Sequence, residues 1–173
     1  MRWLLTEGCG FILGHLAVRF RAWNNWWALE FVKGKDVLSG MEYLIGLIAS
    51  LATAASGKVI GFDRDRAFYP TVLIVVATYY ILFAVMGAPR RTLVLELIFA
   101  SAFFGLAVLG FRWTMWVVVV GLIAHGLFDF VRVGFIHNPG VPSWWPGFCL
   151  AYDLPLGVVL GLMLMRQPKE ARR

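Results

Sequence analysis

The sequence predicts an all-α protein, an integral membrane bundle of five transmembrane helices. Of the 173 residues, 60% are hydrophobic and only 15% are charged, which leaves too little polar surface to cover a soluble globule of this size. Five apolar stretches have the length of about 20 residues that crosses a bilayer core. None of them alternates with period two, as a barrel strand does, and in lipid a helix satisfies its backbone groups internally.

The five stretches follow one another with short breaks. The breaks FDRDRAFYP, GAPRR and FRW contain charged and turn-forming residues that end helices, and only the fourth break, GFIHNPGVPSWWPG, is long enough to hold structure of its own. We expect one transmembrane domain over residues 41–165 and a basic cytoplasmic tail over 166–173. Its helices are predicted at 41–61, 68–87, 92–111, 113–133 and 147–165.

Small residues at four-residue spacing indicate where these helices pack. In lipid, helices associate through close packing, which small side chains permit. Such pairs occur on the first, third and fifth stretches: Gly46 with Ser50, Ser101 with Gly105, and Gly157 with Gly161.

Residues 1–40 differ from the rest of the chain. Their one apolar run, FILGHLAV, is too short to span a bilayer and lacks a small-residue cleavage site. One interpretation is an amphipathic, aromatic extension that lies at the headgroup boundary; the alternative is that Met41 is the true start. The first interpretation rests on clustered basic and aromatic residues: Arg19, Arg21, Trp23, Trp26 and Trp27.

The distribution of lysine and arginine predicts the orientation. From Met41 onward, the face that holds the third helix's start and the long loop carries three of them, Arg90, Arg91 and Arg132. The opposite face carries eight: Lys58, Arg64, Arg66, Arg112, Arg166, Lys169, Arg172 and Arg173. This bias predicts a protein of the cell (inner) membrane whose opposite face and C-terminus lie in the cytoplasm. Adding the five basic residues of 1–40 equalises the two counts, so this expectation depends on the Met41 start.

The net charge of +6 does not indicate a nucleic-acid partner. The basic residues lie in short loops and tails without a contiguous patch, and they are typical of topology determinants and contacts with membrane lipids. Cys9 and Cys149 lie far apart with no CxxC spacing, so neither a disulfide framework nor a zinc knuckle is predicted.

The segment AHGLFDFVR, residues 124–132, places three ionisable groups in an apolar helix. At about 100° per residue, His125, Asp129 and Arg132 share one stripe, which will not face lipid. At a rise of about 1.5 Å per residue, Glu96 of the third helix and Asp153 of the fifth lie at a similar depth below the same membrane face. The four acidic and histidine side chains are therefore expected to share one leaflet.

Carboxylates in hydrocarbon must be compensated. Burying one costs at least about 2.5 kcal/mol, so Glu96, Asp129 and Asp153 must be paired, protonated, metal-bound or hydrated. One arginine and one histidine cannot neutralise all three, so at least one acid is expected to carry a proton. As candidate catalytic residues we assign His125 as a base, Asp153 or Glu96 as the acid, and Asp129 as the residue that orients His125.

A second set of side chains is expected to line a binding pocket around these groups. The loop HNPGVPSWWPGF is stiffened by three prolines and can cap such a pocket, or it can be an ordinary turn with an aromatic anchor. The candidate binding residues are Tyr79, Arg132, His137, Asn138, Trp144, Trp145 and Tyr152.

Several alternatives stay open at these residues. Asp129 and Arg132 can simply pair at a helix end, and the whole set can be a structural polar network. No cofactor is predicted, although a divalent metal site from His125, Asp129 and Glu96, with His137 as a further ligand, has acceptable ligand types. No serine, threonine or cysteine has a spacing to His125 that indicates a nucleophile.

The region AHGLFDF followed by HNPGVPSWWPGFCLAYDLPLG resembles the signature half of a family of small bacterial membrane proteins, the domain of unknown function 6010. The resemblance covers roughly residues 41–165 and rests on the HGxxD element, the Pro/Trp-rich loop and the CxAYD element. It implies a multi-pass fold in a membrane. The family has no assigned activity, so the resemblance transfers no residue role.

The leading hypothesis for function is binding of a lipid or an amphipathic small molecule in a polar intramembrane pocket, with acid–base chemistry as an extension. Whether the chain is an enzyme stays open. The first alternative is a small proton-coupled carrier, which requires polar residues that continue to the opposite face. The second is an accessory subunit of a larger membrane complex, or a homo-oligomer, with a purely structural polar network.

Overall fold

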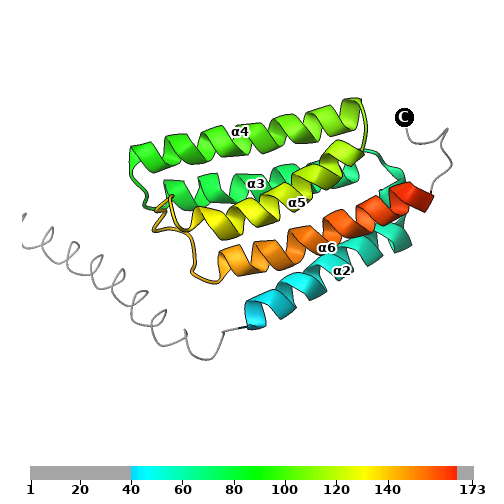
Figure 1. The fold of residues 1–173 in the computed structure, drawn as a ribbon, viewed down its shortest axis with the longest axis horizontal. Coiled ribbons are helices and arrows are strands. Elements are labelled where there is room, and N and C mark those ends of the chain that lie inside the picture. Colours follow the sequence, from blue (N-terminus) through cyan, green and yellow to red (C-terminus); the bar gives the residue numbers. More distant parts are fainter. Residues whose placement is uncertain (1–39, 167–173) are drawn as a thin grey trace, which may run out of the picture. The chain divides into compact units, whose positions relative to one another are not determined.

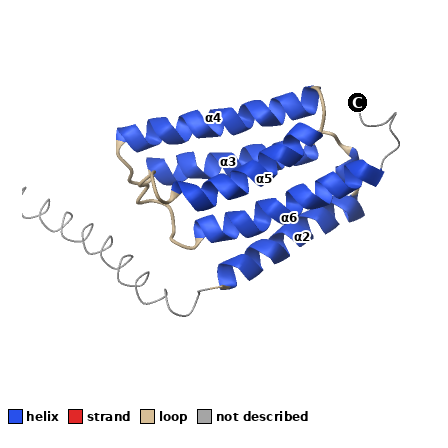
Figure 2. Cartoon of the chain, viewed as in Figure 1, coloured by secondary structure: helices blue, strands red, loops and turns tan. Residues whose placement is uncertain are grey.

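The computed structural model describes residues 40–166, and this part of the chain is helical without any strand. Figure 2 shows the helices and their connecting loops. The predicted all-α class is thereby confirmed, whereas the expectations for residues 1–39 and for the tail beyond Arg166 lie outside the described residues. The elements are α2 (Met41–Ile60), the short 3₁₀ helix η1 (Phe62–Arg64), α3 (Phe68–Val85), α4 (Arg90–Arg112), α5 (Trp116–Arg132) and α6 (Trp145–Arg166).

Four of these helices, α2, α3, α4 and α6, are long and apolar enough to cross a membrane. This finding supports the predicted membrane location. The helix α5 is shorter, with 17 residues. Large apolar side chains are exposed on the outer faces of all five α-helices, as expected for helices in contact with lipid.

The helix ends follow from local sequence. Gly61 ends α2 with a φ of 88°, a left-handed conformation that glycine adopts without strain, and its N–H donates to the Gly57 carbonyl. Trp113 closes α4 through a bond to the Leu109 carbonyl, so α5 begins at Trp116 instead of at residue 113. The helix α6 begins two residues before its predicted start, with a proline in its first turn, where a missing N–H has no cost.

The described helices lie side by side (Figure 1). The α3 and α4 pair lies on one side of α5, while α6 lies on the other and carries α2 on its far side. Gly46 allows the α2–α6 approach, since a Cβ there would lie 2.5 Å from the Phe148 carbonyl oxygen. Gly157 of α6 contacts α5 in the same manner, as the small-residue pattern predicts.

The third small-residue pair does not pack as predicted. Ser101 is exposed, and nothing lies within 4 Å of a Cβ placed on Gly105. In α4 the close approach comes instead from Gly110, where a Cβ would lie 2.3 Å from Cγ2 of Val118 on α5. Small-residue spacing therefore identifies two of the three packing faces and misplaces the third.

The interior of the bundle is divided lengthwise into an apolar part and a polar part. Near the start of α5, the core consists of fully buried apolar side chains such as Leu73, Val118 and Leu122. Toward the end of α5, buried ionisable side chains replace them. The α5–α6 loop lies at this polar end, because it follows Arg132 and leads into Trp145.

Candidate functional site

One face of α5 carries the polar groups of the site. His125, Asp129 and Arg132 all point inward, and each is at most 2% exposed. The glycine that follows His125 brings α6 close, because a Cβ on Gly126 would lie 2.9 Å from a methyl group of Leu154 and 3.1 Å from the Asp153 Cβ. The HG pair of AHGLFDFVR therefore places a histidine and a close helix contact at the same level.

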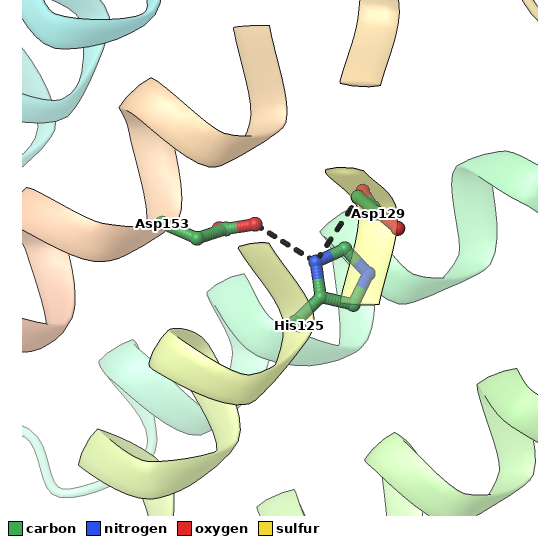
Figure 3. A group of neighbouring side chains, drawn as sticks. All are labelled: His125, Asp129 and Asp153. Carbon is green, nitrogen blue, oxygen red and sulfur yellow. Dashed lines mark hydrogen bonds and ion pairs between the residues drawn. The ribbon is translucent and has the colours of Figure 1, made fainter. Parts of the chain in front are cut away.

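The first group of side chains is the His–Asp cluster, formed by His125, Asp129 and Asp153. Nδ1 of His125 lies 2.8 Å from Oδ2 of Asp153 on α6 and 3.7 Å from Oδ2 of Asp129, one turn further along α5. Figure 3 shows the imidazole between the two carboxyl groups. The predicted base thus has Asp153 as its hydrogen-bond partner, while Asp129 is close enough only for a charge interaction.

The His–Asp cluster is incompletely satisfied. Both carboxylate oxygens of Asp129 and Oδ1 of Asp153 are buried without a hydrogen bond of normal geometry in the described part of the chain. Tyr80 and Cys149 lie near enough to interact with the charge of Asp129. Two acids facing one histidine carry at least one uncompensated negative charge when both are ionised, which is costly in a dry interior.

The second group is the Glu–Arg cluster, formed by Glu96, Arg132 and Asn138. A guanidinium nitrogen of Arg132 donates to Oε1 of Glu96 on α4, and Nδ2 of Asn138 donates to the same oxygen at 3.0 Å. The guanidinium carbon also lies 3.8 Å from the centre of the Tyr80 ring, in cation–π contact. The suggested local pair of Asp129 with Arg132 is therefore wrong, since Arg132 forms its ion pair with Glu96.

The loop after α5 is attached to the Glu–Arg cluster. Asn138 is buried, and its side-chain oxygen accepts from the N–H of Gly140. Thr92 of α4 donates to the His137 carbonyl, while the His137 side chain is exposed and belongs to neither cluster. Gly140 rests against α3, where a Cβ would lie 2.1 Å from the Phe83 carbonyl oxygen.

An apolar groove of about 560 Å³ runs between α3 and α6. None of the four predicted catalytic residues lines it. Three of the predicted binding residues do, namely Tyr79, Trp145 and Tyr152, whereas Arg132, His137, Asn138 and Trp144 do not. The other lining residues come from the α2–α3 connection and from the two helices: Phe62, Asp65, Ala67, Phe68, Thr71, Val72, Val75, Val76, Phe148 and Cys149.

The sequence interpretation missed two residues that connect these features. Cys149 is 1% exposed, lines the groove and interacts with Asp129, so it separates the groove from the His–Asp cluster. Tyr80 lies between the two clusters, with its ring on Arg132 and its hydroxyl near Asp129. The CxAYD element could have indicated Cys149, because Cys149 and Asp153 are four residues apart and therefore share one face of the helix.

The structure also changes the candidate metal ligands. His125, Asp129 and Asp153 offer ligand atoms that all lie within 4.8 Å of one another. Glu96 is paired with Arg132, and the His137 side chain is exposed, so the ligand set suggested by the sequence is not assembled. Asp153 takes the place that the sequence hypothesis gave to Glu96.

Comparisons with protein-family models, with curated proteins and with solved structures gave no match. The fold and the site therefore define residues 40–166 only as a helical region with four helices apolar enough for a membrane and a buried His–Asp cluster.

Proposed function

We propose that all five α-helices cross the membrane. The helix α4 ends at the end of the bundle opposite to the one at which α6 begins (Figure 1). If α4 and α6 both span, the segment between them must return across the bilayer, and α5 is the helix available for that path. Its 17 residues rise about 25 Å, close to the thickness of a bilayer core, and the turn over Val133–Ile136 extends it.

In this arrangement the C-terminal end of α6 faces the cytoplasm of a bacterial inner membrane. The end of the bundle that holds the α2–α3 connection carries the greater number of lysines and arginines counted from Met41, which is the bias of cytoplasmic loops. The resemblance to the domain of unknown function 6010 is consistent with the same architecture.

The proposed function is the binding of a lipid or an amphipathic small molecule, with its apolar part in the groove between α3 and α6. The observation that carries the proposal is the groove itself, whose volume of about 560 Å³ is typical of ligand sites. Its polar boundary supports an amphipathic occupant, because Tyr79 and Trp145 lie at the end where α6 begins and Cys149 separates the groove from the His–Asp cluster.

The His–Asp cluster is the proposed site of any acid–base step. With Nδ1 protonated, His125 donates to Asp153, and a proton can move between them over 2.8 Å. Glu96 is less suited to the role of acid, because it is already paired with Arg132 and Asn138. A proton-coupled carrier has less support, since the core beyond His125 toward the start of α5 is apolar.

A bulky residue in the groove tests ligand binding. We expect Val75→Trp to fill the groove and to abolish lipid adducts in native mass spectrometry of the full chain in mild detergent. Leu82→Trp is the matched control, because Leu82 lies on the same helix, is similarly exposed (54% against 46% for Val75) and does not line the groove. Equal adducts in the two folded variants would refute the proposal.

The role of the His–Asp cluster is tested separately with Asp153→Asn. The amide keeps the shape of the side chain but removes its charge. If the cluster contributes to binding, the folded variant loses ligand retention relative to the wild type and to His137→Asn, which changes an exposed side chain outside both clusters. Unchanged retention would remove Asp153 from the proposal and leave the groove alone.

A further inference from the structure

We propose that His125, Asp129 and Asp153 bind one divalent metal ion of the zinc class. This inference goes beyond ligand binding in the groove and does not depend on it. The three side chains come from two facing helices, α5 with a His/Asp pair one turn apart and α6 with a single Asp. All three residues lie within helices, so rigid backbone and not a loop holds the proposed ligands in place.

The distances fit a single ion. Zinc binds histidine nitrogen and carboxylate oxygen at about 2.0–2.2 Å in tetrahedral geometry, which places neighbouring ligand atoms about 3.4 Å apart. Nδ1 of His125 lies 2.8 Å and 3.7 Å from the nearest oxygens of Asp153 and Asp129, and all three ligand atoms fall within 4.8 Å of one another.

Charge gives the second argument. Arg132, the buried arginine nearest to these acids, is already paired with Glu96. Tyr80 and Cys149 also border Asp129, but among residues 40–166 His125 is the basic side chain that faces both acids, and it supplies one positive charge at most. A divalent cation neutralises two carboxylates and accepts the neutral imidazole as a third ligand, so it resolves the imbalance without a further side chain.

Unused ligand atoms give the third argument. Asp129 is fully buried, yet neither of its oxygens has a hydrogen bond of normal geometry in residues 40–166, and Oδ1 of Asp153 is in the same state. Buried acceptors normally have partners, and coordination to a metal ion supplies one. Figure 3 shows the Asp129 carboxyl group directed toward the same imidazole that Asp153 contacts.

The ligand types favour a zinc-class ion over magnesium or calcium. One imidazole and two carboxylates suit zinc, whereas magnesium and calcium require six or more oxygens, usually with several waters. Three protein ligands leave one position open for a water or for a polar group of a bound molecule. Cys149, which borders Asp129, separates this position from the groove.

The proposed metal replaces the proton of the His–Asp cluster. Coordination through Nδ1 of His125 requires that this nitrogen carry no hydrogen. A protonated ring therefore releases one proton to solvent on binding, whereas a neutral ring moves its hydrogen to Nε2 and releases none. The oxidation state of the ion does not change and no covalent bond of the chain is broken. The same three side chains therefore hold a shared proton without metal and a divalent ion with it.

Metal analysis of the wild-type protein is the primary experiment. The full chain is purified in mild detergent, stripped with a chelator and titrated with Zn²⁺, with native mass spectrometry recording metal and lipid adducts in the same spectrum. We expect one Zn²⁺ per chain, a higher melting temperature with Zn²⁺ than with chelator, and an intense visible spectrum with Co²⁺ that indicates four-coordination. The absence of a stoichiometric Zn²⁺ adduct would overturn the proposal.

Variants locate the site. Asp129→Asn and Asp153→Asn each remove a ligand charge and are expected to weaken Zn²⁺ binding by more than about 100-fold, beyond the usual effect of outer-shell changes. His137→Asn, which alters an exposed histidine outside the site, should bind as the wild type does. If a ligand variant does not fold, the wild-type Co²⁺ spectrum still decides, because a six-coordinate spectrum contradicts this ligand set.

The metal proposal and the proposal of ligand binding in the groove can be tested independently. Val75→Trp fills the groove without touching the His–Asp cluster, so it should lose lipid adducts and keep Zn²⁺. A protein that binds Zn²⁺ but no lipid would refute the groove proposal alone. Lipid binding without Zn²⁺ would refute the metal proposal alone.

Discussion

The two buried clusters each combine carboxyl groups with one basic side chain, yet they differ in how well the charges are compensated. In the Glu–Arg cluster, one acid faces one arginine, and an asparagine from the loop donates to the same oxygen. In the His–Asp cluster, two acids face one histidine and three carboxylate oxygens lack hydrogen bonds among residues 40–166. The charges of Glu96 and Arg132 balance, although Nε of Arg132 also lacks a hydrogen bond in the described part of the chain. The unbalanced acids of the His–Asp cluster are instead a place for a proton, an ion or a ligand.

This difference assigns different tasks to the three polar residues of α5. Arg132 connects α5 to α4 and, through Asn138, to the loop, so we interpret the Glu–Arg cluster as structural. His125 bonds to Asp153 on α6 instead of to the loop, and both oxygens of Asp129 lack a hydrogen bond among residues 40–166. The sequence-based alternative of a purely structural network thus fits one half of the polar region and not the other.

The largest expected effect is the loss of the buried arginine. Arg132→Met leaves Glu96 in the interior without a counter-charge, and removing one partner of a buried pair costs about 3–5 kcal/mol. We expect this loss in the free energy of unfolding, measured by denaturation in mixed micelles. The double variant Arg132→Met with Glu96→Gln should recover most of it, because both charges are then absent. A single variant as stable as the wild type would contradict the structural role.

A smaller loss is expected from Gly140→Ala. The added Cβ would overlap the Phe83 carbonyl oxygen, so the loop must move away from α3 at a cost of about 1–3 kcal/mol. Because Gly140 bonds to Asn138, faster hydrogen exchange should appear in the loop and at Glu96. Exchange around His125 should not change. Equal loosening of both clusters would show that they form one unit, against the present division.

Asp129→Asn is expected to change stability little in the metal-free protein. The substitution removes a buried carboxylate that has no normal hydrogen bond, so it should cost less than about 1 kcal/mol or stabilise the fold. The measurement is the same denaturation experiment, performed with a chelator. A loss as large as that of Arg132→Met would mean that Asp129 has a structural partner and would remove the contrast between the clusters.

The smallest effect is expected for His137→Asn. This imidazole is exposed, and the loop is held by the backbone carbonyl of His137, which the substitution keeps. The free energy of unfolding should stay within about 0.5 kcal/mol of the wild-type value. A larger loss would indicate that the side chain at this position also supports the Glu–Arg cluster.

Much of the fold was predictable because the bilayer imposes simple rules on composition. The first helix was predicted at 41–61 and is observed at Met41–Ile60, and the others agree within about three residues at each end. Their apolar length and the charged breaks between them determine these limits. The packing faces were only partly predictable, since Ser101 and Gly105 have the favoured spacing yet face outward.

The sequence predicted which residues gather in the candidate site, but it did not predict which acid pairs with which basic side chain. Depth along each helix indicates that Glu96, His125, Asp129 and Asp153 occupy one end of the bundle, and the structure brings them together in two groups. Which acid meets Arg132 depends on how α4 and α5 are rotated, and a single sequence does not specify helix rotation. The groove was not predicted for the same reason, because it lies between α3 and α6, whose backbones do not approach each other as closely as those of neighbouring helices.

The attachment of α2 has a consequence for biosynthesis. The helix packs chiefly along α6, with Gly46 against the Phe148 carbonyl and Thr53 bonded to Tyr152, 99 residues later in the chain. At translation rates of about 5–20 residues per second, the ribosome needs roughly 5–20 s to make that interval. During this time the small-residue face of α2 meets lipid instead of its partner. The first described helix to leave the ribosome is thus the last to be assembled, and an insertion factor that shields it would act during this interval.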